Sequence, residues 1–131
     1  MRRFAVILLL VATPALAASK LRLAAPRCVV IADHQVYPIK GARIEGAILR
    51  CTIKVTVPRS VEPPTPARLA LRQDGNELAK TEVKLALSPG TTDVELQVEA
   101  PDALNGCMPY ELVTRIGDAE AVKKAVPYCP D

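Results

Sequence analysis

The chain has 131 residues, 50% of them hydrophobic but only 3% aromatic, and a formal net charge of +3. This hydrophobic content excludes a disordered chain, and so small a net charge gives no reason to expect nucleic-acid binding. The scarcity of aromatic residues predicts an aliphatic core of Val, Leu, Ile and Ala.

Residues 1–17 have the layout of a secretory signal peptide. Two arginines precede an apolar run from Phe4 to Ala12, and a small-x-small cleavage site occupies residues 15–17. The run is too short to span a bilayer, which needs about 20 apolar residues. We therefore expect a periplasmic or secreted protein with a single domain over residues 18–131 and no membrane span after cleavage.

The first half of the domain has the pattern of β-strands. Cys28 to Pro38 is a β-type apolar run, and Ile44 to Val57 is the strongest strand signal. From Leu49 onward apolar and polar residues alternate with the period of two expected of a half-buried strand. Ile48 lies on the opposite parity, so we expect a bulge near Gly46.

A proline-rich connection and three further strands follow. Pro58 to Pro66 holds four prolines, and because proline has no N–H to donate, we expect a stiff loop outside the sheet ladder. A ligand for a peptide-binding groove is the alternative interpretation of this loop. The three predicted strands cover Arg68 to Arg72, Glu77 to Leu87 and Thr92 to Glu99, with turns at Asp74-Gly75 and at residues 88–90.

The segment from Cys107 to Cys129 predicts a closing hairpin. Gly117-Asp118 supplies a turn, and the two cysteines are equally distant from Asp118, which places Thr114 opposite Val122. The competing interpretation is a helix over residues 118–126, which is too short to be stable alone.

Six or seven short strands separated by turns predict an all-β fold, an antiparallel β-sandwich. The order RLALRQDGNELAKTEVKLALSPGTTDVELQV, over residues 68–98, resembles the middle of bacterial immunoglobulin-like modules of the CARDB or fibronectin type III sort. This resemblance implies an immunoglobulin-like binding, adhesive or spacer domain, and it brings no catalytic motif with it.

Four cysteines in an exported chain predict two structural disulfides. The favoured pairing joins Cys28 to Cys51 around a turn at Ile39-Lys40. It also joins Cys107 to Cys129, so that each bridge crosses a hairpin. The alternative nests a Cys51–Cys107 bridge inside a Cys28–Cys129 bridge and pins the two sheets together. Redox or metal chemistry is disfavoured, because no C-x-x-C occurs and no cysteine has a histidine at ligand spacing.

Candidate catalytic residues are scarce. His34 is the single histidine and follows Asp33. A general base or pH switch is one interpretation, and a polar residue in a strand break is the favoured one. The sequence has no Gly-x-Ser-x-Gly elbow, phosphate loop, HExxH motif or calcium loop. We therefore expect no enzyme activity, no metal site and no cofactor.

Charge is unevenly distributed along the domain. Residues 20–72 hold ten basic and three acidic residues, whereas residues 74–120 hold three basic and ten acidic ones. The favoured interpretation is that early and late strands lie side by side and neutralise each other. The alternative is a partner-binding surface, for which the candidates are Arg50, Lys54, Arg59, Arg68, Arg72, Asp93, Glu95 and Glu99.

These observations favour a small exported, non-enzymatic binding or accessory module that contacts another envelope or secreted protein. The loops Pro58 to Pro66 and Pro101 to Gly106 are its predicted contact sites. The alternative is an inhibitor of a periplasmic or extracellular hydrolase, which would insert the disulfide-stiffened loop between Cys28 and Cys51 into the enzyme's cleft. The sequence does not indicate an oligomeric state.

Overall fold

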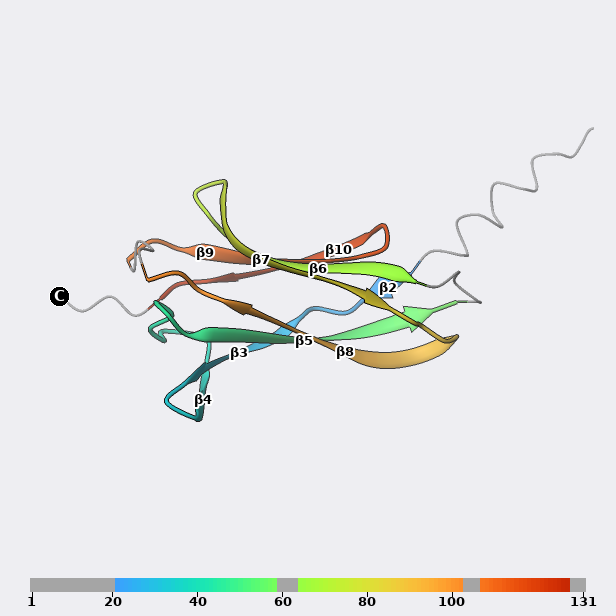
Figure 1. Cartoon of the computed structure of the whole chain (residues 1–131), viewed down its shortest axis with the longest axis horizontal. Helices are drawn as coiled ribbons and strands as arrows, with labels where there is room; N and C mark the ends of the chain where they lie inside the picture. Colours follow the sequence, from blue (N-terminus) through green and yellow to red (C-terminus); the bar gives the residue numbers. More distant parts are fainter. Residues whose placement is uncertain (1–20, 59–63, 103–106, 128–131) are drawn as a thin grey trace, which may run out of the picture.

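A computed structural model of the chain describes residues 21–58, 64–102 and 107–127, which form two antiparallel sheets in two layers (Figure 1). The predicted β-sandwich is confirmed, and the described residues contain no helix. They form nine strands rather than six or seven, because Cys28 to Pro38 makes two strands and a short strand precedes it. The strands are β2 (Arg22–Leu23), β3 (Arg27–Ala32), β4 (Gln35–Pro38), β5 (Ile48–Val57), β6 (Thr65–Gln73), β7 (Asn76–Leu85), β8 (Gly90–Glu99), β9 (Tyr110–Ile116) and β10 (Ala119–Ala125).

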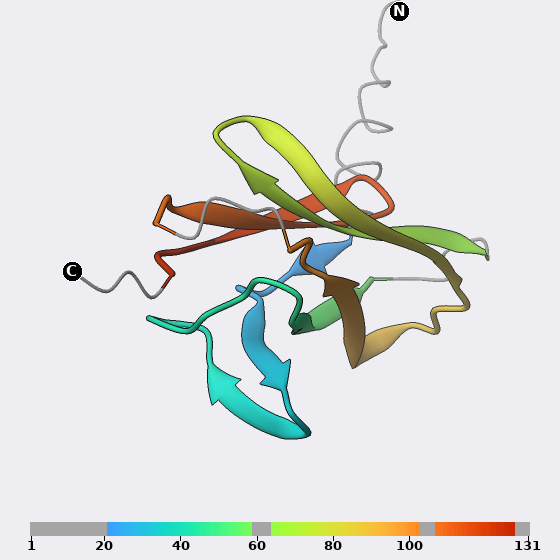
Figure 2. The ribbon, with the colours of Figure 1, turned by 60° about the vertical axis from the view of Figure 1, so that its left-hand side comes forward.

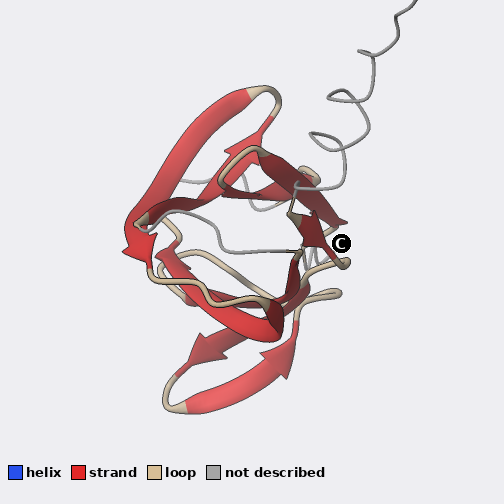
Figure 3. Ribbon diagram, turned by 90° about the vertical axis from the view of Figure 1, so that its right-hand side faces the viewer, coloured by secondary structure: helices blue, strands red, loops and turns tan. Residues whose placement is uncertain are grey.

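Each sheet is built around one long strand. In the first, termed the β5 sheet, β5 pairs with β8 on one side and with β3 and β2 on the other, and β4 pairs with the far side of β3. In the second, termed the β6 sheet, the strand order is β10-β9-β6-β7. Figure 3 looks along the layers and shows the two sheets facing each other.

The edges of the two sheets meet on both sides of the sandwich. On one side β7 lies against β8, and the Thr81 hydroxyl donates to the Gln97 carbonyl oxygen at 2.6 Å. On the other side β10 lies against β2. Strand β4 extends beyond this closed arrangement, and the β3–β4 hairpin projects away from the sandwich (Figures 1 and 3).

The core is aliphatic, as predicted, because the alternation of each strand buries one face. On β5 the buried residues are Leu49, Cys51, Ile53, Val55 and Val57. Tyr110 is the one aromatic side chain in the core of the described residues, and its buried hydroxyl has no hydrogen-bond partner. Burial raises the pKa of the Tyr110 phenol above its ordinary value. The Thr114 hydroxyl is also buried without a partner.

The expectation of a bulge near Gly46 is wrong, because β5 begins only at Ile48. Gly46 instead lies in a turn with a φ of 72°, and its N–H donates to the Ala100 carbonyl oxygen at 3.1 Å. A Cβ at this position would lie 2.6 Å from Oδ1 of Asp102. Both the positive φ and the close approach therefore require glycine here.

The proline-rich segment also departs from the prediction, since Pro66 lies within β6 and pairs with Lys84 of β7. The ladder between β6 and β9 begins only at Ala67. Pro66 thus precedes the part of β6 that has a neighbour on both sides, where a missing N–H would be costly. Residues 59–63 of the predicted loop lie outside the described part of the chain.

The terminal hairpin forms as strands β9 and β10 rather than as a helix, but its predicted register is wrong by one residue. Thr114 lies opposite Ala121 instead of Val122. The reason is that the turn consists of two residues, Gly117 and Asp118, rather than three centred on Asp118.

The predicted Cys28–Cys51 disulfide is present, and it joins directly opposite residues of β3 and β5 with a Cα–Cα distance of 4.1 Å. It excludes the nested pairing, which required Cys51 for Cys107. Ile39-Lys40 is not the apex of a simple hairpin, because β4 intervenes and pairs with the opposite side of β3. Cys129 lies outside the described residues, so the Cys107–Cys129 bridge stays a prediction.

Candidate functional site

The β3–β4 hairpin is held in a defined shape by its turn and by the disulfide at its base. Asp33 and His34 have φ values of 51° and 63°. A two-residue hairpin turn of type I′ requires positive φ at both positions, and aspartate and histidine tolerate this region better than most residues. The Cys28–Cys51 bridge ties the start of β3 to β5. The hairpin therefore projects as a constrained element (Figure 2).

The outer face of this hairpin is apolar. Because Cys28 and Val30 are buried in the core, the alternation along β3 turns Val29 and Ile31 to the outer face. On β4, Val36 lies opposite Ile31 and Pro38 opposite Val29, while Ile48 of β5 lies opposite Ile31 on the other side. The apolar outer patch is defined as Val29, Ile31, Val36, Pro38 and Ile48.

The apolar outer patch leaves large side chains in contact with water. Val36 is 60% exposed and Ile48 is 37% exposed. Single exposed apolar residues are ordinary on protein surfaces. Here the exposed Val36, Pro38 and Ile48 lie beside the half-buried Val29 and Ile31 on three strands, and such contiguous apolar patches mark sites of interaction with other molecules.

A charged rim borders the patch along β5 and β8. Arg50 Nε lies 3.6 Å from Glu95 Oε1, and a guanidinium nitrogen of Arg27 lies 3.8 Å from Asp93 Oδ1. These pairs are largely exposed, so each contributes at most about 1 kcal/mol to stability. Glu99 lies opposite Ile48 at the end of the same face. An apolar centre with a polar rim is the usual composition of a protein–protein interface.

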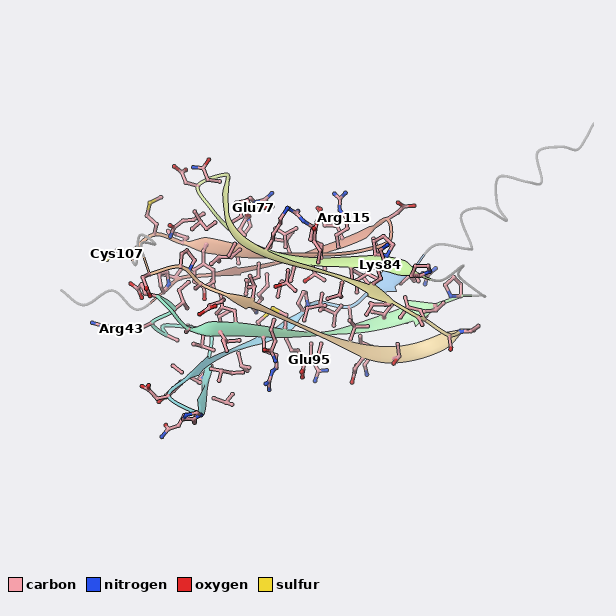
Figure 4. All side chains as sticks on the ribbon, viewed as in Figure 1. Arg43, Glu77, Lys84, Glu95, Cys107 and Arg115 are labelled. Carbon is pink, nitrogen blue, oxygen red and sulfur yellow. A yellow bond between two sulfur atoms is a disulfide. The ribbon has the colours of Figure 1, made fainter. Side chains whose placement is uncertain are left out.

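The structure divides the charged candidate residues between two separate faces. Arg50, Lys54, Asp93, Glu95 and Glu99 lie on β5 and β8 of the β5 sheet. Figure 4 shows Glu95 beside this layer, away from Glu77 and Arg115 of the other layer.

The remaining candidates with described positions lie on β6, in the other sheet. Arg68 pairs with Glu77 and Glu82, the latter at 3.3 Å. Arg72 pairs with Glu111 at 2.8 Å. Basic early strands and acidic later strands therefore neutralise each other within the fold on both faces. Arg59 lies outside the described residues.

No protein-family model matches the chain, and no curated protein sequence matches it. Among the described residues, no group of three or more His, Cys, Asp and Glu side chains is placed to hold a metal ion. No helix in the described part of the chain is long and apolar enough to cross a membrane. His34 lies at the exposed tip of the β3–β4 hairpin, as expected for a strand break.

The apolar outer patch was not among the predicted sites, although the sequence carries a signal for it. From Cys28 to Ile31 every residue is apolar, so both faces of β3 must be apolar. Ile48 is a second signal, because it is an apolar residue at an outward-facing position of β5. It lies on the outer face opposite Ile31, not beside a bulge. Of the predicted contact loops, residues 59–63 and 103–106 lie outside the described residues.

Proposed function

We propose that this protein is a small exported, non-enzymatic binding module that docks on another envelope or secreted protein through the apolar outer patch. The observation that carries the proposal is the exposure of Val36 on the projecting β3–β4 hairpin and of Ile48 on β5, both of which lie opposite Ile31. Covering apolar surface contributes about 25 cal/mol for each Å² removed from water. The occupant is therefore a protein with a complementary apolar surface and a charged border that matches the Arg50–Glu95 pair.

Export is supported by two independent features. The first is the sequence of residues 1–17, which has the layout of a signal peptide. The second is the Cys28–Cys51 disulfide, since such bridges persist in oxidising compartments and are rare in the cytosol.

The strand order also supports the proposal of an immunoglobulin-like module of the CARDB or fibronectin type III sort. In constant-type immunoglobulin domains the fourth strand joins the sheet of the first, second and fifth strands. If the short β2 and the projecting β4 are set aside, β3, β5 and β6 are the first three strands and β7 is the fourth. Strand β7 pairs with β6, in the other sheet, instead. The chain is therefore proposed as a relative of the non-antibody modules, which act in binding, adhesion or spacing.

The test uses two exposed valines on opposite sheets. The mature chain is used to capture partners from the envelope and secreted fractions of its source, with Val36→Lys and Val122→Lys variants in parallel. Val122 is 40% exposed and lies on β10 of the β6 sheet, so it is the matched control. We expect Val36→Lys to reduce capture of one specific protein by about tenfold or more, and Val122→Lys to leave it unchanged.

Circular dichroism and thermal unfolding verify that both variants fold. Equal capture by Val36→Lys and the unaltered chain would show that the patch is not the docking site. A dimer of the purified chain that Val36→Lys dissociates would show that the patch is occupied by a second copy instead of another protein.

A second candidate function, inhibition of a hydrolase, is favoured by the hairpin itself. Its tip residues Asp33 and His34 are exposed, and its base is closed by a disulfide, as suits a loop inserted into an enzyme's cleft. If the captured partner is a hydrolase, its activity is measured with rising amounts of the chain. Stoichiometric inhibition that is lost in Asp33→Ala/His34→Ala would support this function, and unchanged hydrolysis would exclude it.

A further inference from the structure

A hollow lies at the end of β10, where the connection after β4 meets that strand. This hollow has a volume of about 470 Å³. Its two sides are joined by a hydrogen bond in which the Gly41 N–H donates to the Val126 carbonyl oxygen at 3.2 Å. Its position differs from that of the apolar outer patch, because no patch residue lines it.

The walls of the hollow are apolar. Ile39 is buried and belongs to the core, and Ala125 packs against the core from the end of β10. Pro109 and Val126 complete the walls, and Val126 is 58% exposed. Small-molecule sites commonly have volumes of about 300–1,000 Å³ and mainly apolar walls with a few polar groups. Both the size and the lining of this hollow fit that description.

The polar groups at the hollow are three lysines, Lys40, Lys123 and Lys124. Among the described residues, Lys40 and Lys123 have no ion-pair partner, and Lys124 lies 4.0 Å from Oε2 of Glu111. That carboxylate is already paired with Arg72 at 2.8 Å. The hollow therefore combines apolar walls with an excess of positive charge.

Lysines on an edge strand also discourage pairing with other molecules, which is an alternative role for Lys123 and Lys124 on β10. That role does not account for Lys40, which lies in the connection after β4, outside any strand. Nor does it account for the apolar side chains that line the hollow together with the lysines.

We propose that this hollow binds the acyl chain of a single-chain anionic amphiphile, such as a fatty-acid carboxylate. The acyl chain lies against Ile39, Pro109 and Val126, where it covers apolar surface. The carboxylate lies beside the Lys40 and Lys123 ammonium groups, where it meets opposite charge, because Lys124 is on the other face of β10, towards Glu111. A neutral or cationic amphiphile with the same chain lacks the second interaction and binds more weakly.

The test uses octanoate below its micelle concentration, titrated into the mature disulfide-bonded chain and followed by amide chemical shifts. We expect saturable shifts at residues 39–41 and 123–126, and no saturable shifts with octyltrimethylammonium. In Lys40→Gln/Lys123→Gln the octanoate Kd rises by roughly fivefold or more. The matched control, Lys54→Gln/Lys84→Gln, removes two exposed lysines elsewhere and leaves the Kd unchanged.

Three outcomes would overturn the proposal. The first is the absence of saturable octanoate binding, including the case in which the chain binds anionic phosphatidylglycerol vesicles but not the monomer. The second is equal binding of octanoate and the cation, which would show an apolar contact without charge selection. The third is an equal loss of affinity in both double variants, which would show a general effect of net charge.

Discussion

Replacing Tyr110 with phenylalanine tests whether the core contains an unpaired phenol. The side chain is 1% exposed, and its hydroxyl has no hydrogen-bond partner. Burying a polar group without a partner costs about 1–3 kcal/mol, and phenylalanine fills nearly the same volume without that cost. We therefore expect Tyr110→Phe to raise the free energy of unfolding at pH 7 by about 1–3 kcal/mol.

The same substitution changes the dependence of stability on pH. Burial raises the pKa of Tyr110 in the folded state, so above pH 10 the folded state holds a proton that the unfolded state releases. The free energy of unfolding of the unaltered chain therefore falls as pH rises through 10. At pH 11 this loss in the free energy of unfolding amounts to about 1.4 kcal/mol relative to neutral pH, and we expect no such loss in Tyr110→Phe.

The assay is urea unfolding of the oxidised chain at several pH values between 7 and 11. Tyr37→Phe is the control, because Tyr37 is exposed and its hydroxyl donates to Gln35 Oε1 at 2.9 Å on the surface. Its stability is expected to stay within about 0.5 kcal/mol of the unaltered chain. A loss of stability in Tyr110→Phe at pH 7 would refute the reasoning, because it would reveal a hydrogen bond to the phenol.

Four further variants test the core, two glycine turns and the disulfide. Thr114→Val removes a second buried, unpaired hydroxyl, so we expect urea unfolding to show a free energy of unfolding about 1 kcal/mol higher. A lower free energy of unfolding would show that the Thr114 hydroxyl has a hydrogen-bond partner. Gly46→Ala and Gly41→Ala each place a side chain at positive φ and are expected to lower stability by about 1 kcal/mol or more. The loss is larger at Gly46, where the new Cβ meets Asp102, and a larger loss at Gly41, which has open space, would contradict the geometry. Cys28→Ala/Cys51→Ala opens a loop of 23 residues and is expected to cost roughly 3 kcal/mol, and unchanged unfolding midpoints would refute a folded-state bridge.

The sequence predicted those parts of the fold that depend on local pattern. The alternation from Leu49 to Val57 identified the buried face of β5, because one face of that strand packs on the other sheet. Asp74-Gly75 identified the turn between β6 and β7, because that turn needs positive φ. The Cys28–Cys51 pairing is present as predicted, although β4 intervenes where a simple hairpin around Ile39-Lys40 was expected, since the bridge joins opposite residues of the neighbouring strands β3 and β5.

The errors arose where tertiary contacts decide the outcome. The terminal hairpin is offset by one residue because its two-residue turn sets the register, not the spacing of the cysteines. Ile48 lies on the outer face instead of beside a bulge because its neighbours there, Ile31 and Val36, come from other strands, and the pattern within β5 carries no sign of them. The apolar outer patch and the lysine-rimmed hollow both combine residues from separate strands, so spacing along the chain could not reveal them.

The Cys28–Cys51 bridge joins two strands of the same sheet, and this has a mechanical consequence. When the chain is pulled from its two ends, the segment between Cys28 and Cys51, which are separated by 23 positions in the sequence, cannot extend. Roughly 80 Å of contour length therefore stays hidden until the bridge is reduced. The bridge crosses between neighbouring strands and not between the layers, so it does not itself hold the two sheets together. A pulling force can therefore separate the sheets while β3 and β5 remain joined.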